Sequence, residues 1–252
     1  MSFVSGFVTV FESLVLLAHR AFLWLPESAE SREVFFAVRM RAKQRLMAKR
    51  PFRLIVGITG ATGTILGVRL LQVLKDHSVE THLILSNWGA RTLVHETPYS
   101  VTRVQEMATK CYGAQDQAAA VSSGSFITDG MVVCPCSVRS LAAIAQGHGD
   151  SLVHRAADVI LKERRKLVLV VRETPLSDIH IENMLRLSRM GAVIFPPVPA
   201  FYNHPKTIDD VVEQTVLRIL DQFNLHLSSE DRWSGKMTVS TKRPAHAPKS
   251  RK

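Results

Sequence analysis

The clearest signal of the fold is the stretch Arg53-Leu-Ile-Val-Gly-Ile-Thr-Gly60-Ala-Thr-Gly63-Thr-Ile-Leu-Gly67. An apolar strand over residues 53–59 leads into a glycine-rich turn, and an amphipathic helix over residues 63–77 follows. This layout places bare backbone N–H groups and a helix N-terminus at one point, which suits a ligand phosphate. The stretch therefore predicts a phosphate-bearing cofactor or substrate.

The alternation of strand and helix continues downstream. The sequence predicts strands at 80–85, 131–133, 167–171 and 193–195, and helices at 137–147, 151–163 and 207–223. Short, wholly apolar strands are typical of a parallel sheet that helices cover on both faces. We therefore expect a single α/β domain, a flavodoxin-like (Rossmann-like) doubly wound parallel sheet, with its ligand at the carboxyl ends of the strands.

The formal net charge of +10 over 252 residues lies mainly at the ends of the chain. Residues 1–50 contain eight Lys/Arg and four Glu, and residues 232–252 contain seven Lys/Arg and no acid, whereas residues 51–231 are nearly neutral. A nucleic-acid-binding domain should carry its basic excess on the folded core, so nucleic acid is not an expected partner. The three cysteines lack zinc spacing, so neither a disulfide framework nor a metal site is expected.

The ends of the chain differ from its middle. Residues 1–50 are expected to form an N-terminal extension to a domain over 51–228, and residues 229–252 a basic tail that is partly disordered. Charged residues interrupt the apolar run 7–25, so we expect no transmembrane span. The basic segment 39–50 favours a mitochondrial leader, whereas the glutamates before it favour a cytoplasmic protein with a membrane-associating or disordered extension.

The glycine-rich turn also opens many NAD(P)-dependent reductases, but two observations argue against a dinucleotide. Such a site needs an acidic residue at the end of the second strand to hold a ribose, and this chain has Ser86 there. Short-chain reductases also need a Tyr and a Lys four apart on a helix, and the pair Tyr202 and Lys206 has Pro205 inside it. The hydroxyl of Ser86 suits a mononucleotide instead.

Residues 51–228 resemble the flavin prenyltransferase family of the UbiX/Pad type. The resemblance implies a domain that binds reduced FMN and joins a dimethylallyl group from dimethylallyl phosphate to flavin N5 and C6 without a metal. The prenylated FMN would then serve a UbiD-type decarboxylase. Members of the family assemble as homododecamers built from trimers, with sites between subunits. The strings that carry the resemblance are Gly57–Gly63, Glu80–Leu83, Ser122–Phe126, Pro135–Ser137, Arg155–Arg165, Val171–Pro175, Pro196–Tyr202 and Asp221–Phe223.

The resemblance assigns roles to individual residues. It implies FMN contacts from Gly60, Ala61, Thr62, Ser86, Ser137, Ser140 and Arg172. It implies a clamp for the prenyl phosphate made of Lys162, Tyr202 and Arg218, with Arg155 as a neighbour. It assigns catalysis to Glu173, Glu96 and Ser137, and a cover over the prenyl site to Trp233. Glu173 would carry a proton between the flavin and the leaving phosphate.

Plainer interpretations and other functions stay open. The serines can cap helices, the cations can be surface charges, and Arg172 with Glu173 can form a structural ion pair. An FMN-dependent cysteine decarboxylase of the same fold uses a Pro-x-Met-Asn segment, where this chain has Pro135-Cys-Ser-Val. A non-catalytic FMN-binding regulatory subunit is the other alternative, although it would not need a second phosphate clamp. The sequence does not decide between a monophosphate and a diphosphate donor.

Overall fold

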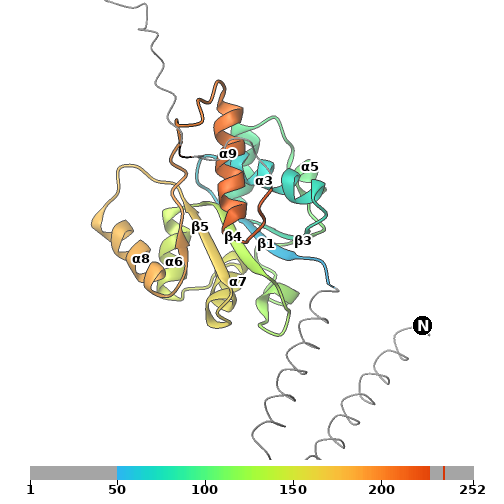
Figure 1. The fold of residues 1–252 in the computed structure, drawn as a ribbon. Coiled ribbons are helices and arrows are strands. Elements are labelled where there is room, and N and C mark those ends of the chain that lie inside the picture. Colours follow the sequence, from blue (N-terminus) through green and yellow to red (C-terminus); the bar gives the residue numbers. More distant parts are fainter. Residues whose placement is uncertain (1–49, 228–234, 236–252) are drawn as a thin grey trace, which may run out of the picture. The chain divides into compact units, whose positions relative to one another are not determined.

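The computed structural model describes residues 50–227 and residue 235. Within this part of the chain, six parallel strands form one sheet in the order β3-β2-β1-β4-β5-β6 (Figure 1). The strands are β1 (Arg53–Ile58), β2 (Glu80–Leu85), β3 (Lys110–Tyr112), β4 (Gly130–Cys136), β5 (Lys166–Val171) and β6 (Val193–Ile194). Rossmann-like sheets have this strand order, whereas flavodoxin-like sheets follow the order 2-1-3-4-5.

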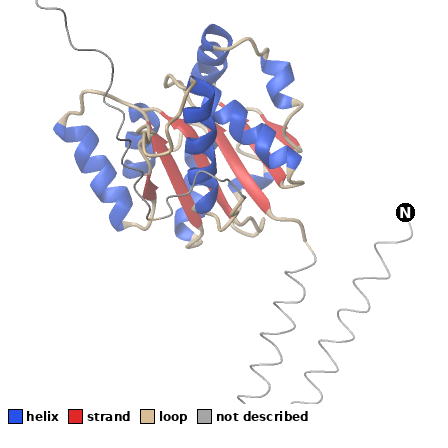
Figure 2. Ribbon diagram, turned by 45° about the horizontal axis from the view of Figure 1, so that its top comes forward, coloured by secondary structure: helices blue, strands red, loops and turns tan. Residues whose placement is uncertain are grey.

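Helices cover both faces of the sheet (Figure 2). They are α3 (Thr64–Asp76), α4 (Asn87–Glu96), α5 (Val101–Gln105), α6 (Val138–Gln146), α7 (Leu152–Lys162), α8 (Asp178–Arg189) and α9 (Ile208–Asp221), with a short 3₁₀ turn at Ala120–Ser122. One apolar core joins the sheet to α3 and α9, and a second core joins the opposite face to α6, α7 and α8. The predicted doubly wound parallel sheet is confirmed.

Strand β1 shows how the sequence builds these two layers. Leu54, Val56 and Ile58 point into the core beneath α3 and α9, whereas Ile55 points into the other core. Alternation of side chains along a strand requires this division, and a strand covered on both faces is therefore apolar throughout. On α3, the predicted apolar face is also buried, as shown by Leu66, Leu70, Val73 and Leu74.

The elements that the sequence pattern missed are those with little buried surface. Strand β3 has three residues, none of them fully buried, and α4 buries only Gly89 and Leu93. Helix α8 buries only Asn183 and Leu187, and its apolar residues Ile179, Ile181 and Leu185 are exposed. The ends of the predicted elements lie within two residues of the observed ends, except that β4 extends to both sides of 131–133 and is continued by Cys134-Pro-Cys136.

The strand order reverses between β1 and β4, and the chain closes tightly at this point. The Thr59 hydroxyl donates to the Pro135 carbonyl at 2.8 Å, and the Ser137 N–H donates to the Thr59 hydroxyl oxygen at 2.8 Å. Gly67 lets α3 approach β4, because a Cβ at this position would lie 2.5 Å from the Cys134 carbonyl oxygen. The carboxyl ends of two neighbouring strands are thus held together where parallel α/β sheets bind ligands.

Several predictions lie wholly or partly outside the described residues. These are the N-terminal extension, the basic tail and Trp233. Within residues 50–227, none of the helices combines the length and the apolar character needed to cross a bilayer. Cys134 and Cys136 are fully buried, and burial raises the pKa of Cys136 to about 12, so both thiols stay protonated at neutral pH.

Candidate functional site

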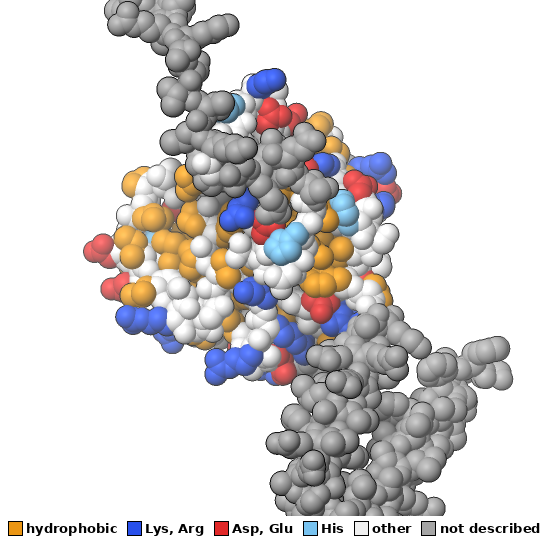
Figure 3. Space-filling view, viewed as in Figure 1, with side chains coloured by type: hydrophobic (Ala, Val, Ile, Leu, Met, Phe, Trp, Pro, Cys, Tyr) orange, Lys and Arg blue, Asp and Glu red, His pale blue; other side chains and the backbone are white. Residues whose placement is uncertain are grey.

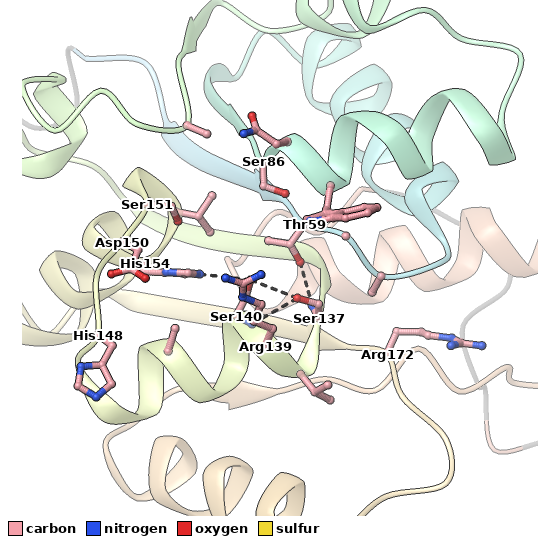
Figure 4. Close-up of a pocket in the computed structure, with 18 of the residues that line it drawn as sticks. Thr59, Ser86, Ser137, Arg139, Ser140, His148, Asp150, Ser151, His154 and Arg172 are labelled. Atoms are coloured by element: carbon pink, nitrogen blue, oxygen red, sulfur yellow. Dashed lines mark hydrogen bonds between the residues drawn. The ribbon is translucent and has the colours of Figure 1, made fainter.

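A cavity of about 670 Å³ opens at the carboxyl ends of the strands, where the strand order reverses (Figure 4). This volume falls within the range of roughly 300–1,000 Å³ that is usual for sites of small molecules and cofactors. All seven predicted FMN contacts lie in its wall, together with Glu173. They are Gly60, Ala61, Thr62, Ser86, Ser137, Ser140 and Arg172. The sequence therefore located the cavity correctly, whichever ligand it binds.

Two helices begin at this cavity. Ser86 caps α4 by accepting the Gly89 N–H at 3.0 Å, and Ser137 caps α6 by accepting the Ser140 N–H at 3.3 Å. Among the described residues, the N–H groups in the first two positions of each helix, at residues 87, 88, 138 and 139, have no hydrogen-bond partner. Free N–H groups at helix N-termini attract anions through the helix dipole. The cavity is therefore suited to a phosphate.

The N-terminus of α3 is not free, and this corrects the interpretation of the glycine-rich turn. The Glu96 carboxylate accepts the N–H groups of Gly63 at 2.9 Å and Thr64 at 3.1 Å, and the Thr64 hydroxyl at 2.9 Å. Burial would raise the pKa of Glu96, but hydrogen bonds from Thr62, Thr64 and Gly63 outweigh it and lower the pKa. A side-chain anion thus occupies the position where a dinucleotide fold places its ligand phosphate.

Glu96 is absent from the cavity wall. Its predicted contact with the reaction is therefore not supported by the single chain, and its bonds give it the role of a cap. The turn itself still faces the cavity through Gly60, Ala61 and Thr62. At Gly60 an added Cβ would lie 2.5 Å from the Trp88 Cβ, so only glycine lets the turn lie against Trp88, whose ring is 59% exposed.

Arg172 and Glu173 follow β5 directly and stand at the mouth of the cavity. The Arg172 N–H donates to the Cys136 carbonyl at 3.1 Å, which joins the ends of β4 and β5. The Glu173 Oε1 accepts the Thr174 N–H at 3.0 Å. In the described chain no ion pair joins Arg172 to Glu173, so the structural ion pair considered above is not formed. In Figure 4 the Arg172 side chain extends away from Ser137 and Ser140.

The wall opposite the glycine-rich turn contains His154, His148, Asp150 and Arg139 (Figure 4). The His154 Nε2 lies 3.3 Å from the Ser140 Oγ, and the Ser140 Oγ lies 3.2 Å from the Ser137 Oγ. Burial lowers the pKa of His154; Asp150 opposes this shift and Arg139 adds to it. The imidazole is therefore neutral at pH 7.

The predicted phosphate clamp does not lie in the cavity of one chain. Lys162 ends α7, just before β5 begins, and so lies at the amino edge of the sheet, opposite the cavity. It pairs with Glu163, and Arg155 pairs with Asp158 at 2.6 Å. The Arg155 Nε also donates to the Ser122 carbonyl, and Lys162 lies close to Gly124. These two cations therefore form a separate basic cluster with the serine-rich loop 122–126.

The other two predicted clamp residues, Tyr202 and Arg218, are absent from the cavity wall and are not part of the basic cluster. Tyr202 is 45% exposed in the loop between β6 and α9. Arg218 lies near the end of α9 and pairs with Asp221 at 2.7 Å. Helix α9 begins with a capping box, in which Thr207 and Asp210 bond to each other's backbone N–H groups. In a single chain the four predicted clamp residues are thus not brought together at the cavity.

Sequence reasoning missed several residues of the cavity wall. They are Thr59, Asn87, Trp88, Ala114, Gln115, Val138, Arg139, Ala143, His148, Asp150, Ser151, Val153 and His154. Thr59 and Asn87 had a usable signal, because Thr59 directly follows a strand and Asn87 directly follows a capping serine at the carboxyl edge. His154 had none, because the register of α7 against α6 decides which of its side chains reach the cavity.

Comparisons with known proteins identify the family of the chain. Residues 42–220 match the Flavoprotein family. The chain is 59% identical to "Flavin prenyltransferase PAD1, mitochondrial" of Saccharomyces cerevisiae, over 74% of this chain and 77% of that protein.

Two solved structures share the fold with a TM-score of 0.72. One is AnUbiX (PadA1) in complex with FMN and dimethylallyl pyrophosphate, which is 52% identical and covers 75% of this chain and 100% of its own. The other is a dodecameric FMN-dependent UbiX-like decarboxylase from Escherichia coli O157:H7, which is 58% identical and covers 73% of this chain and 100% of its own. The chain therefore belongs to the UbiX/Pad1 flavin prenyltransferase family of flavoproteins.

Proposed function

We propose that this protein is a flavin prenyltransferase that joins a dimethylallyl group from dimethylallyl phosphate to N5 and C6 of reduced FMN. The observation that carries the proposal is the cavity itself. It combines the glycine-rich turn, two helix starts whose first N–H groups have no partner among the described residues, and the residues Arg172 and Glu173, in a chain 59% identical to a flavin prenyltransferase. The prenylated FMN would be the product delivered to a UbiD-type decarboxylase.

The residues of the cavity fit FMN. Its volume suits a ligand of this size, and the free N–H groups at the starts of α4 and α6 suit a phosphate. Ser86, Ser137 and Ser140 add hydroxyl groups at the same helix ends, while Arg172 supplies a positive charge at the mouth. Reduced FMN supplies the nucleophilic N5 and C6 atoms of the reaction.

Glu173 is the proposed acid–base residue. It stands in the cavity wall after β5, and its second carboxylate oxygen has no partner among the described residues. A carboxylate at this point can take a proton from the nucleophile and give one to the leaving phosphate. Ser137 is the second proposed catalytic group, since its hydroxyl lies at the start of α6. We propose that Glu96 acts indirectly, by holding the turn Gly60–Gly63 in shape.

We propose that the donor site is completed in an assembly of several chains by Lys162, Arg155, Tyr202 and Arg218. A dodecamer is the proposed assembly, because one relative is dodecameric. The positions of these residues outside the cavity of one chain support this proposal. Exposed apolar side chains on α8, on the loop before α9 and at the start of α9 support it as well, among them Ile179, Val198, Phe201 and Ile208. Figure 3 shows apolar side chains on one face of the described residues.

Two further proposals concern the ends of the chain and its location. We propose that residues 1–50 precede a catalytic domain over 51–228 and direct the protein to mitochondria, as the name of the yeast relative indicates for that protein. Trp233 is proposed to cover the prenyl site. Expression of the full chain fused to a fluorescent protein, beside a chain that starts at residue 51, tests the targeting role. Equal distributions of the two fusions would contradict it.

The decisive experiment incubates the purified full chain with reduced FMN and dimethylallyl phosphate under anaerobic conditions. Mass spectrometry of the released flavin should show a gain of one five-carbon unit. Parallel reactions with the diphosphate decide which donor the enzyme uses. If the flavin mass is unchanged with both donors, while FMN binds tightly, the regulatory-subunit alternative replaces the enzyme.

The Glu173→Gln variant separates binding from chemistry. It should bind FMN with nearly unchanged affinity and lose about 10²–10⁴-fold in prenylation rate, the usual contribution of a general acid–base group. The matched control is Glu106→Gln, because Glu106 forms an exposed pair with Arg103 and is absent from the cavity wall. Equal rates for Glu173→Gln and this control would remove Glu173 from the mechanism.

A further inference from the structure

One side chain in the cavity wall is placed to control the hydroxyl groups at the start of α6. His154 lies in the first turn of α7, and its ring reaches toward Ser140 on α6 (Figure 4). The His154 Nε2 is 3.3 Å from the Ser140 Oγ. The Ser137 hydroxyl, which belongs to the cap of α6, is 3.2 Å from the same oxygen. Ser140 thus stands between the cap and the imidazole.

Ser140 is the one hydrogen-bond partner of the His154 side chain within the described residues, because Nδ1 is buried and has no partner. A buried ring nitrogen without a partner is a cost to the folded state. An apolar side chain of similar size would line the same wall without this cost. The polar ring is therefore best explained by its contact with Ser140.

The direction of the hydrogen bond between the His154 Nε2 and the Ser140 Oγ determines where the Ser140 hydroxyl proton can point. A serine hydroxyl has one proton to donate and two lone pairs that accept. The Ser137 hydroxyl donates to one lone pair of the Ser140 Oγ. If Nε2 accepted the Ser140 proton, this hydroxyl would have none left for a bound anion. If Nε2–H instead donates to the second lone pair, the Ser140 proton is free to point into the cavity.

We propose that His154 is a positioning residue that donates its Nε2–H to Ser140 and so directs the Ser140 hydroxyl proton toward the phosphate of the flavin. The inference rests on the proposed function, because it takes FMN to occupy this cavity with its phosphate at the start of α6. The oxygen–oxygen distance of 3.2 Å is longer than the usual value of about 2.7–2.8 Å for such a bond. The chain of hydroxyls therefore has room to tighten around a ligand.

Titration of the full chain with FMN and with riboflavin tests the proposal, because the two flavins differ only in the phosphate. His154→Leu should weaken FMN binding about 5–15-fold, the usual effect of one lost hydrogen bond, and leave riboflavin binding within about twofold. His154→Gln, whose side-chain amide can donate in place of Nε2–H, should restore FMN binding to within about twofold of the wild type. The double variant His154→Leu/Ser140→Ala should bind FMN no more weakly than Ser140→Ala alone.

Three outcomes would overturn the role of His154. They are equal weakening of both flavins, failure of the Gln variant to restore FMN binding, and additive losses in the double variant. His154→Met replaces the Leu variant if the latter does not fold, and circular dichroism checks folding in every case. If the wild-type chain binds neither flavin, the proposed function fails first, and that result is distinct from a loss confined to the variants.

Discussion

Replacing Glu96 by Gln tests whether its carboxylate caps α3 or takes part in the chemistry. The Oε2 of Glu96 accepts two backbone N–H groups and one hydroxyl at 2.9–3.1 Å. A capping interaction contributes about 0.5–2 kcal/mol, and the exposed position of Glu96 places it in the lower part of this range, because water and salt screen the charge. Glutamine keeps an accepting oxygen but loses the charge. We therefore expect Glu96→Gln to lower the free energy of unfolding by about 0.5–1 kcal/mol at neutral pH.

The loss should depend on pH in a defined direction. Hydrogen bonds lower the pKa of Glu96 below its ordinary value of 4.5, despite the opposing effect of burial. A carboxyl group with a lowered folded-state pKa stabilises the fold fully above its unfolded pKa, and this contribution is lost as the pH falls through the folded value. The difference in stability between wild type and Glu96→Gln should therefore be largest near neutral pH and shrink below pH 4.5.

Urea unfolding followed by circular dichroism, at neutral pH and at acid pH, measures both effects. Glu106→Gln is the matched control, because Glu106 forms an exposed pair with Arg103 at 3.2 Å and should change stability by less than about 0.5 kcal/mol. The same proteins are assayed for prenylation, and Glu96→Gln should keep most of its rate at saturating FMN. A variant that unfolds like wild type at neutral pH but has lost prenylation would refute the capping role and restore Glu96 to catalysis.

Three further substitutions probe the packing and the donor site. Gly67→Ala places a Cβ 2.5 Å from the Cys134 carbonyl oxygen, so urea unfolding should show a net loss of about 1–2 kcal/mol, the clash exceeding the gain of about 1 kcal/mol in helix propensity. Gly60→Ala places a Cβ 2.5 Å from the Trp88 Cβ and should weaken FMN binding about tenfold by displacing Trp88. An unchanged dissociation constant for FMN in a fluorescence titration would contradict this. Lys162→Ala should raise KM for dimethylallyl phosphate about 10–100-fold without changing FMN affinity, and an unchanged KM would exclude Lys162 from the clamp.

The site divides into residues that local sequence signals locate and residues that only packing locates. Ser86, Ser137 and Arg172 follow a strand directly and Gly60 lies two residues after β1, so the rule that ligands bind at the carboxyl ends of parallel strands applies to all four. The serine positions gain support from capping, which acts within one turn of a helix. These residues therefore reached the cavity as the sequence predicted.

Other residues depend on contacts between distant segments. Glu96 caps a helix that begins 32 residues before it, and no pattern within α4 announces this contact. Lys162 and Arg218 carry charges suited to a phosphate, but one chain places them outside the cavity, so their spacing along the sequence says little about the site. Helices α4 and α8 were not predicted either, and few of their side chains are buried.

Apolar periodicity and glycine geometry act over a few neighbouring residues. The local sequence is therefore enough to predict the alternation of strands and helices, the burial of the sheet on both faces and the glycine-rich turn. Tertiary packing determines at which helix starts the backbone N–H groups are free to bind an anion. The start of α3 is closed by Glu96, whereas the starts of α4 and α6 are free, and His154 reaches Ser140 across two helices. These outcomes depend on how separate elements pack against one sheet, which no local stretch of sequence specifies.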